Sequence, residues 1–228
     1  MKEQDVLKIL SEVGAVITDS HFVYVSGKHG PAYINKDALY PHTEKTSQLC
    51  LKIASWFSTD GVDVVIAPAV GGVILSQWVA HHLTRITKIP RHEVLGVYAD
   101  KVTVNGEDNF VIKRGYDKLI DHKHVLVVED LLTTGGSVKK VVAAVRACGG
   151  TIAGVGVLCN RGGVTRENLG VRKLFALANV KMEMYEEVSC PLCERGVPIN
   201  TDVGHGREFL ARKKHDLICA EECQEARL

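Results

Sequence analysis

The chain has 228 residues, of which 46% are hydrophobic and 24% charged, and its 28 Lys and Arg nearly balance 27 Asp and Glu. This composition supports a folded core and excludes wholesale disorder. The near-zero net charge argues against a nucleic-acid binder held by a basic face, and the length favours one domain with additions over two independent domains.

The sequence has no pattern typical of a membrane span or of a secretory signal. Its most apolar stretch, Val64–Leu75, is too short to cross a bilayer and contains Pro68. The first five residues lack the charged-then-apolar order of a signal peptide. We therefore expect a cytoplasmic protein with no membrane partner, in which the seven Cys are thiols or metal ligands and not disulfides.

Two helices are expected in the first sixty residues, on either side of the polar, turn-rich run Phe22–Pro41. The first has apolar residues at helical spacing and stops at Gly14. The second covers residues 44–58 and is expected to place four apolar side chains on one buried stripe. These are Leu49, Ile53, Trp56 and Phe57.

The remaining chain alternates short apolar runs with helical patterns. Strands are expected at 62–67, 94–98, 124–128, 151–159 and 173–178, and helices at 74–83 and 137–148. Strands that are apolar throughout and alternate with helices predict an α/β fold with a parallel sheet covered on both faces. Binding sites in such folds lie beyond the carboxyl ends of the strands, so the loops after them are the places to examine.

Two further segments have a composition of their own. The polar stretch 99–123 is longer than most loops in compact domains, which predicts a functional lid or a two-stranded flap. Residues 189–228 are rich in Cys and in charged residues, and we expect them to form an appendage.

Residues 125–137 combine a buried strand with an anion-binding turn. Four apolar residues lead into Glu129 and Asp130, and the turn Leu131-Leu132-Thr133-Thr134-Gly135-Gly136-Ser137 then opens a helix. Free N–H groups at a helix N-terminus attract phosphate, and glycines let the backbone approach it. Adjacent carboxylates repel phosphate but suit the hydroxyls of a ribose. The segment is neither a Walker loop nor a Rossmann fingerprint.

This segment resembles the phosphoribosyl-pyrophosphate signature of type I phosphoribosyltransferases, and the similarity extends over roughly residues 5–180. Residues 65–73 resemble the family's pyrophosphate loop, with Gly71 and Gly72 as its glycine pair, and the stretch 99–123 lies where the family has its mobile catalytic flap. The resemblance implies a type I phosphoribosyltransferase fold, with a central parallel sheet flanked by helices. It places an N-terminal hood (1–43) and the flap in a domain of residues 1–180, followed by a Cys-containing extension, 181–228.

Residues 22–35 are similar to the N-terminal motif of orotate phosphoribosyltransferases, which forms the hood over the base. The positions that fit are Ser26, Gly27, Pro31, Tyr33 and Asn35. Residues 156–163 resemble the strand end that supplies the orotate-binding Arg, so Arg161 is expected to meet the orotate carboxylate. The same resemblance implies base-binding roles for Lys28, Tyr33 and Thr133.

Other members of the family stay open as alternatives. The 6-oxopurine enzymes use Asp where this chain has Thr133, which argues against them, whereas the loop of adenine phosphoribosyltransferases resembles residues 131–137 closely. Val25 and Gly71 stand where orotate enzymes usually have Lys, and the flap keeps clearly only Lys101 and Gly106 of their pattern. These departures motivate a third interpretation, a regulatory protein that binds phosphoribosyl pyrophosphate without catalysis.

The flap contains two further cations, Lys113 and Arg114, which could supply the missing positive charge.

The resemblance implies transfer of a phosphoribosyl group from phosphoribosyl pyrophosphate to a ring nitrogen of a nucleobase, with orotate favoured. Mg²⁺ would bind the substrate oxygens near Glu129 and Asp130, which would orient the ribose hydroxyls. The turn 131–137 would hold the 5′-phosphate, and Gly71 and Gly72 would hold the pyrophosphate. Lys101 would reach from the neighbouring subunit of a homodimer to offset the charge of the leaving group.

The C-terminal cysteines suggest a second metal. Cys190 and Cys193 form a CxxC pair, and Cys219 and Cys223 form a CxxxC pair. Together they could make a structural Cys₄ zinc site. The alternative is two unrelated pairs of thiols.

Overall fold

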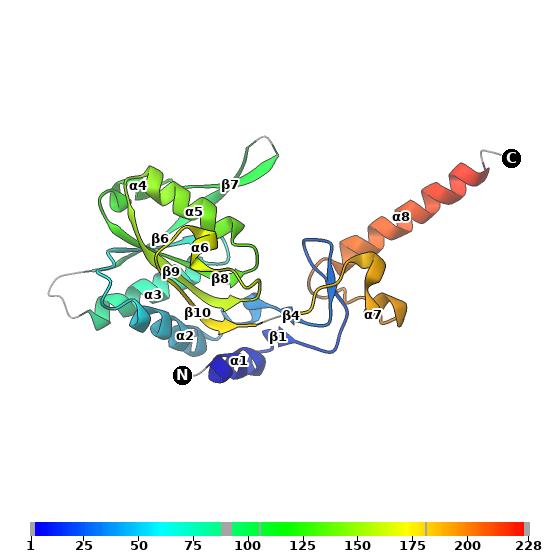
Figure 1. Cartoon of the computed structure of the whole chain (residues 1–228), viewed down its shortest axis with the longest axis horizontal. Helices are drawn as coiled ribbons and strands as arrows, with labels where there is room; N and C mark the ends of the chain where they lie inside the picture. Colours follow the sequence, from blue (N-terminus) through cyan, green and yellow to red (C-terminus); the bar gives the residue numbers. More distant parts are fainter. Residues whose placement is uncertain (1–2, 88–92, 105, 181, 226–228) are drawn as a thin grey trace. The chain divides into compact units, whose positions relative to one another are not determined.

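The computed structural model describes residues 3–87, 93–104, 106–180 and 182–225, with the backbone alone for 216–225. The chain forms two compact units (Figure 1). Unit 1 comprises Met1–Val13 and Lys36–Lys181, and unit 2 comprises Gly14–Asn35 and Met182–Leu228. Unit 2 thus joins part of the segment expected as the N-terminal hood to the C-terminal extension.

Unit 1 is built on a six-stranded sheet with the strand order β10-β9-β8-β5-β6-β7. All neighbouring pairs run parallel except β6 and β7. The strands are β5 (Val64–Pro68), β6 (Leu95–Val104), β7 (Glu107–Val111), β8 (His124–Leu132), β9 (Thr151–Asn160) and β10 (Leu174–Asn179). This arrangement confirms the α/β class and the mostly parallel sheet, and it places β8 and β5 at the centre.

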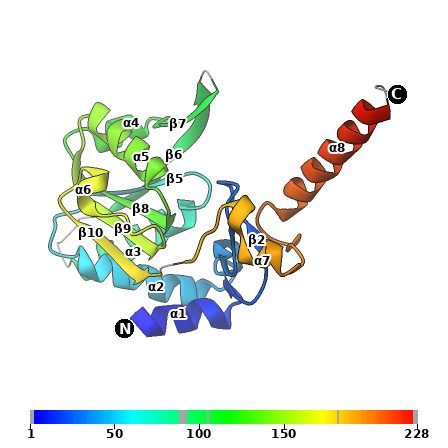
Figure 2. The ribbon, with the colours of Figure 1, turned by 45° about the vertical axis from the view of Figure 1, so that its right-hand side comes forward.

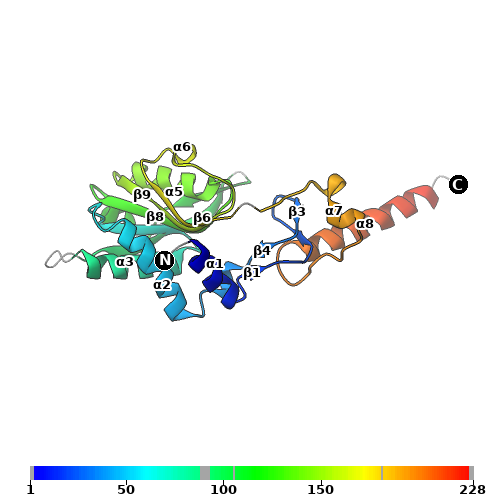
Figure 3. The same ribbon diagram turned by 60° about the horizontal axis from the view of Figure 1, so that its bottom comes forward.

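Helices cover both faces of this sheet, as Figures 1 and 3 show. Helices α1, α2 and α3 pack on one face, and α5 packs on the other. The helices of unit 1 are α1 (Glu3–Glu12), α2 (Thr43–Trp56), α3 (Val73–Ile86), α4 (Tyr116–Ile120), α5 (Gly136–Ala147) and α6 (Arg166–Leu169). Each long helix buries an apolar stripe at helical spacing; in α5 it consists of Val138, Val141, Val142 and Val145.

The stripe expected on the second helix is partly wrong. Leu49 and Ile53 are fully buried, and Phe57 is buried just past the helix end, but 58% of the Trp56 surface is exposed. The Trp56 ring stacks instead on Phe175 of β10, with 4.4 Å between ring centroids. A stacked pair at a sheet edge shields one face of the indole while the other stays in water.

The polar stretch after the second parallel strand forms a hairpin. β6 runs on to Val104 and pairs with β7, with Asp100 opposite Val111 and Val104 opposite Glu107. Figure 2 shows this hairpin extending beyond the rest of the sheet. It agrees with the two-stranded form expected for the segment. After Val111 the chain returns to the sheet through α4, whose Ile120 is fully buried in the core.

Unit 2 has little regular structure and a small core. Its strands have two residues each, and they pair as β1 with β4 and β2 with β3. Its elements are β1 (Val16–Ile17), β2 (Phe22–Val23), β3 (His29–Gly30), β4 (Tyr33–Ile34), the 3₁₀ turn η2 (Glu187–Ser189), α7 (Pro191–Glu194) and α8 (Gly206–Glu225). The larger buried apolar side chains are Phe22, Val23, Tyr24, Ile34, Leu192 and Phe209.

Within the described ranges, none of the helices is both long enough and apolar enough to cross a bilayer.

Candidate functional site

Two carboxylates lie at the carboxyl end of the central strand β8. Glu129 and Asp130 are 7% and 4% exposed, although each carries an ionisable group. Each carboxylate accepts a hydrogen bond from a nearby backbone amide. The Leu131 amide donates to Asp130 Oδ1 at 2.6 Å, and the Asp130 amide donates to Glu129 Oε1 at 3.1 Å. Burial of two acids side by side is costly unless partners compensate it.

The partners come from the segment that precedes α2. The ammonium of Lys36, in the 3₁₀ turn η1 (Lys36–Ala38), lies 2.7 Å from Asp130 Oδ2. The hydroxyl of Tyr40 lies 2.5 Å from the carbonyl oxygen of Gly71, to which it donates, and 3.2 Å from the same Asp130 oxygen. A cation and a neutral donor therefore meet at the end of the strand. Neither residue was singled out from the sequence.

Gly71 makes room for the Lys36 ammonium. A Cβ atom at position 71 would lie 2.1 Å from Lys36 Nζ and 2.3 Å from Asp130 Oδ2, closer than any real contact. The ammonium thus occupies the space that a side chain at 71 would fill. The positive charge that orotate enzymes usually carry in this loop is absent at 71 and present beside it on Lys36.

The environment of the site moves three pKa values. Burial, reinforced by the charge of Asp130, raises the pKa of Glu129 well above its ordinary value. Burial disfavours the charged form of Lys36, but the Asp130 carboxylate outweighs it, so the pKa of Lys36 is raised. Burial and then Asp130 raise the pKa of Tyr40, which keeps its phenol protonated as a donor.

The turn after β8 leads into the first turn of α5. Gly135 adopts φ +77°, a left-handed conformation that favours glycine, and α5 begins at Gly136. A cavity of about 130 Å³ lies over this turn, lined by residues 131–138 and by Glu129. Backbone amides at a helix N-terminus, together with the hydroxyls of Thr133, Thr134 and Ser137, suit the oxygens of a phosphate group.

The end of the neighbouring strand β9 places Arg161 against the same turn. The Arg161 Nε donates to Thr133 Oγ1 at 2.8 Å, and the Arg161 amide donates to the Leu132 carbonyl at 3.0 Å. Because β8 and β9 are parallel neighbours, their carboxyl ends meet at one edge. The structure thereby brings together two residues expected to contact the base.

A second cavity, of about 840 Å³, opens beside the loop that follows β5. It is lined by residues from the ends of β5 and β6 and from the turn before α2, among them Lys36, Tyr40, Gly71, Tyr98 and Asp100. Arg114 borders it, with its Nε 3.5 Å from Asp100 Oδ2 and its guanidinium over the Tyr98 ring. This cavity is large enough for a polar small molecule.

The remaining expected site residues belong to other elements. Lys101 is on β6 of the hairpin, where its ammonium lies 2.6 Å from Asp108 Oδ2 and both groups are about half exposed. Lys28 and Tyr33 belong to unit 2. Within that unit Lys28 pairs with Glu186 at 2.7 Å, and the Tyr33 ring packs near Phe22.

The expected four-cysteine cluster is described only in part. Cys190 and Cys193 lie together in unit 2, but next to His21 and His29. Cys219 and Cys223 are in α8, and their side chains lie outside the described residues. Two histidines eight residues apart were a signal available in the sequence, but their proximity to the CxxC pair was not.

Known proteins resemble this chain in sequence and structure. A family model described as a phosphoribosyl transferase domain matches residues 40–186. Orotate phosphoribosyltransferases of Desulforamulus reducens and Pelotomaculum thermopropionicum are 36% and 37% identical to it, each over 87% of this chain and 95% of the relative. The crystal structure of orotate phosphoribosyltransferase from Aeropyrum pernix has a TM-score of 0.57 at 27% identity, covering 77% of this chain and 94% of that chain.

Adenine phosphoribosyltransferase from Thermoanaerobacter pseudethanolicus shares the fold, with a TM-score of 0.55 at 15% identity over 76% of this chain and 99% of that chain.

The raised pKa of Glu129 predicts a stability that depends on pH. Below the unfolded pKa of about 4.5 the carboxyl is protonated in both states, so it costs nothing. As pH rises from there to the folded pKa, the unfolded state ionises first and the free energy of unfolding falls. We expect Glu129→Gln to unfold at higher urea concentration than the natural protein at pH ~8, with the difference shrinking toward pH ~4.

The matched control is Glu107→Gln, an exposed carboxyl on β7. A Glu129→Gln protein that is less stable than the natural one across this pH range would contradict the prediction.

Proposed function

This chain belongs to the phosphoribosyltransferase family, and on that premise we propose how its residues carry out phosphoribosyl transfer to orotate. Membership confirms the resemblance seen in residues 125–137 and 65–73. The enzyme transfers the phosphoribosyl group between phosphoribosyl pyrophosphate and a nucleobase. The observation that carries the site assignment is the buried pair Glu129 and Asp130, which leads directly into the turn at the start of α5.

Each part of the sugar phosphate has a counterpart along this edge. The turn 133–137 holds the 5′-phosphate, because its amides and hydroxyls face the small cavity. Glu129 and Asp130 accept hydrogen bonds from the ribose hydroxyls. The pyrophosphate binds at Gly71 and Gly72, next to the larger cavity, where Lys36 supplies a positive charge. This order follows the strand ends β8 and β5, which are neighbours in the sheet.

The same carboxylates fit a divalent cation. Glu129 and Asp130 offer the oxygen ligands that Mg²⁺ prefers, at a site that would otherwise bury two acids. Bound with the substrate, Mg²⁺ would neutralise charge on the pyrophosphate oxygens. Lys36 contributes to the same balance from the protein, since its ammonium is held at Asp130 by an ion pair of 2.7 Å.

Orotate is the base that this site favours. Its carboxylate needs a cationic partner, and the Arg161 guanidinium is fixed at the mouth of the phosphate turn by its contact with Thr133. Adenine has no anionic group that would pair with that charge. The two relatives named above, at 36% and 37% identity, are orotate phosphoribosyltransferases, which supports the same choice.

The test is a comparison of bases. We expect pyrophosphate release from phosphoribosyl pyrophosphate and Mg²⁺ to be fastest by far with orotate, when adenine, hypoxanthine, xanthine and uracil are supplied in turn. A preference for adenine would assign the chain to salvage of purines. Release with none of the bases, from protein that still binds phosphoribosyl pyrophosphate, would indicate a regulatory protein.

Arg161→Ala is expected to weaken orotate binding selectively. Loss of a charged hydrogen bond costs about 1.5–3 kcal/mol, which corresponds to a rise of roughly 10–150-fold in KM for orotate. The KM for phosphoribosyl pyrophosphate should change much less. The control is Arg166→Ala, an exposed Arg on α6 that pairs with Glu167. An unchanged orotate KM in Arg161→Ala would remove Arg161 from the base site.

The hairpin β6–β7 acts across a homodimer. Lys101 and its partner Asp108 are both well exposed on a hairpin that extends beyond the sheet, so the ammonium is free to exchange one anion for another. Pyrophosphate held at a neighbouring subunit is such an anion. Closure of this flap would exclude water, which would otherwise hydrolyse the activated sugar.

Mixing two inactive variants tests the action in trans. Lys101→Ala and Asp130→Asn are each expected to be inactive alone. After random subunit exchange half of the dimers are mixed and each has one intact site, so activity should return to about a quarter of the natural level. In the control, Lys113→Ala is mixed with Asp130→Asn in place of Lys101→Ala. If exchange is demonstrated and activity does not return, Lys101 acts within its own subunit or has no catalytic role.

A further inference from the structure

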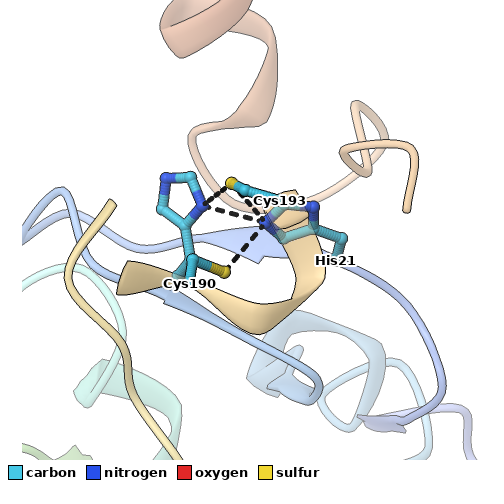
Figure 4. A group of neighbouring side chains, drawn as sticks. His21, Cys190 and Cys193 are labelled. Atoms are coloured by element: carbon cyan, nitrogen blue, oxygen red, sulfur yellow. Dashed lines mark hydrogen bonds between the residues drawn. The ribbon is translucent and has the colours of Figure 1, made fainter. Parts of the chain in front are cut away.

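Unit 2 contains a group of four side chains that are all common ligands of metals. They are His21, His29, Cys190 and Cys193, and one ligand atom from each lies within 4.8 Å of all the others. Figure 4 shows the His21 ring and the two thiols converging on one point. The group draws on two parts of the chain that are far apart in sequence.

The distances approach those of a tetrahedral site. His21 Nε2 lies 2.8 Å from His29 Nδ1, and Cys193 Sγ lies 3.3 Å from that same His29 atom. The Cys190 and Cys193 sulfurs lie 3.7 and 3.8 Å from His21 Nε2. Zinc bonds of about 2.0–2.1 Å to nitrogen and about 2.3 Å to sulfur imply tetrahedral edges of roughly 3.3–3.8 Å. The two nitrogens would have to separate by about half an ångström, and the two sulfur distances to His21 already lie within this range.

The tautomer of His21 is already set for coordination. Its Nδ1 lies 2.8 Å from the Val197 carbonyl oxygen, and a carbonyl can only accept. Nδ1 therefore carries the proton, and Nε2 presents its lone pair to the other three side chains. A hydrogen bond from the second ring nitrogen to a backbone carbonyl is the usual way in which proteins orient a histidine ligand.

Burial shows that the group is not an accidental surface cluster. His21 and Cys190 are 1% exposed and His29 is 0% exposed, whereas Cys193 closes the group from the exposed side. Polar rings buried at this cost in a small core call for a compensating interaction, because apolar side chains would otherwise serve better.

Backbone hydrogen bonds of His21 and His29 also join the two chain segments of unit 2. His29 exchanges both backbone hydrogen bonds with Tyr185, each at 2.8 Å, and the Asn200 amide donates to the His21 carbonyl at 2.7 Å. These bonds bring the hairpin β2–β3 against the segment that contains the CxxC pair. Small units with thin cores commonly depend on such a cross-link, supplied by a disulfide or a metal.

We infer that His21, His29, Cys190 and Cys193 bind one structural zinc ion that joins the hairpin β2–β3 to the C-terminal extension. Two thiolates and two imidazoles in a closed tetrahedral set favour Zn²⁺ over Mg²⁺ and other hard cations. All four positions are filled by protein, so the ion has no open position for substrate. The ligand set replaces two of the four cysteines expected from the sequence with histidines.

The natural full-length protein provides the first test. Purified without chelators from cells supplied with zinc, it should contain one zinc per chain. X-ray absorption at the zinc edge should show two sulfur and two nitrogen neighbours, at about 2.3 and 2.0 Å. Protein that holds no zinc and takes up none when reduced and incubated with Zn²⁺ would overturn the inference, as would a shell of four sulfurs.

Variants test the ligand set. Cys190→Ser and His21→Gln should lose the zinc, whereas the matched changes Cys219→Ser and Cys223→Ser should keep one ion per chain. Full zinc in Cys190→Ser, or its loss in Cys219→Ser, would overturn the assignment. If a ligand variant fails to fold, the absorption spectrum of the natural protein still decides. None of these readouts depends on catalysis, so they stand or fall separately from the proposed transfer to orotate.

Discussion

The ion pair between Lys36 and Asp130 is the interaction on which the proposed active site depends. It allows two adjacent acids to be buried at the end of the central strand, where an uncompensated carboxylate would cost several kcal/mol. The Tyr40 hydroxyl lies 3.2 Å from the same oxygen, and its raised pKa keeps the phenol protonated, with its proton donated to the Gly71 carbonyl. Among the residues that the structure describes, no cation forms an ion pair with Glu129, and burial together with the Asp130 charge raises the pKa of Glu129.

The parallel sheet explains why distant loops meet at this pair. The strands β5, β8 and β9 are parallel neighbours. The loop with Gly71 and Gly72, the turn 131–137 and Arg161 therefore all follow strand ends at one edge of the sheet. The helices only need to bury one apolar stripe each to hold that register. The hairpin β6–β7 departs from this pattern because its strands are antiparallel and extend beyond the rest of the sheet, where Lys101 pairs with the exposed Asp108.

The sequence predicted what depends on neighbours along the chain. Strand, acidic pair, turn and helix in residues 125–137 form one local pattern, and the order is confirmed. β8 nevertheless runs on to Leu132, so the acidic pair and the first two residues of the expected turn belong to the strand. Contacts between segments distant in sequence were not predictable. In the sequence, Lys36 is one charged residue among many, and only the fold places it beside Asp130 of β8. Likewise, His21 and His29 become candidate metal ligands only because the fold places Cys190 and Cys193 next to them. The predicted burial of Trp56 is wrong for a similar reason, because helical spacing does not distinguish a residue in the core from one at the edge of the sheet.

The space shared by Lys36 and position 71 limits which residues can occupy either position. One pocket has room for a single ammonium, delivered either from the 3₁₀ turn η1 or from the loop after β5. A lysine at 71 would collide with the present one, and a small residue at 36 would leave Asp130 without its cation. The two positions are thus coupled, because any side chain at 71 would displace the Lys36 ammonium from its place beside Asp130.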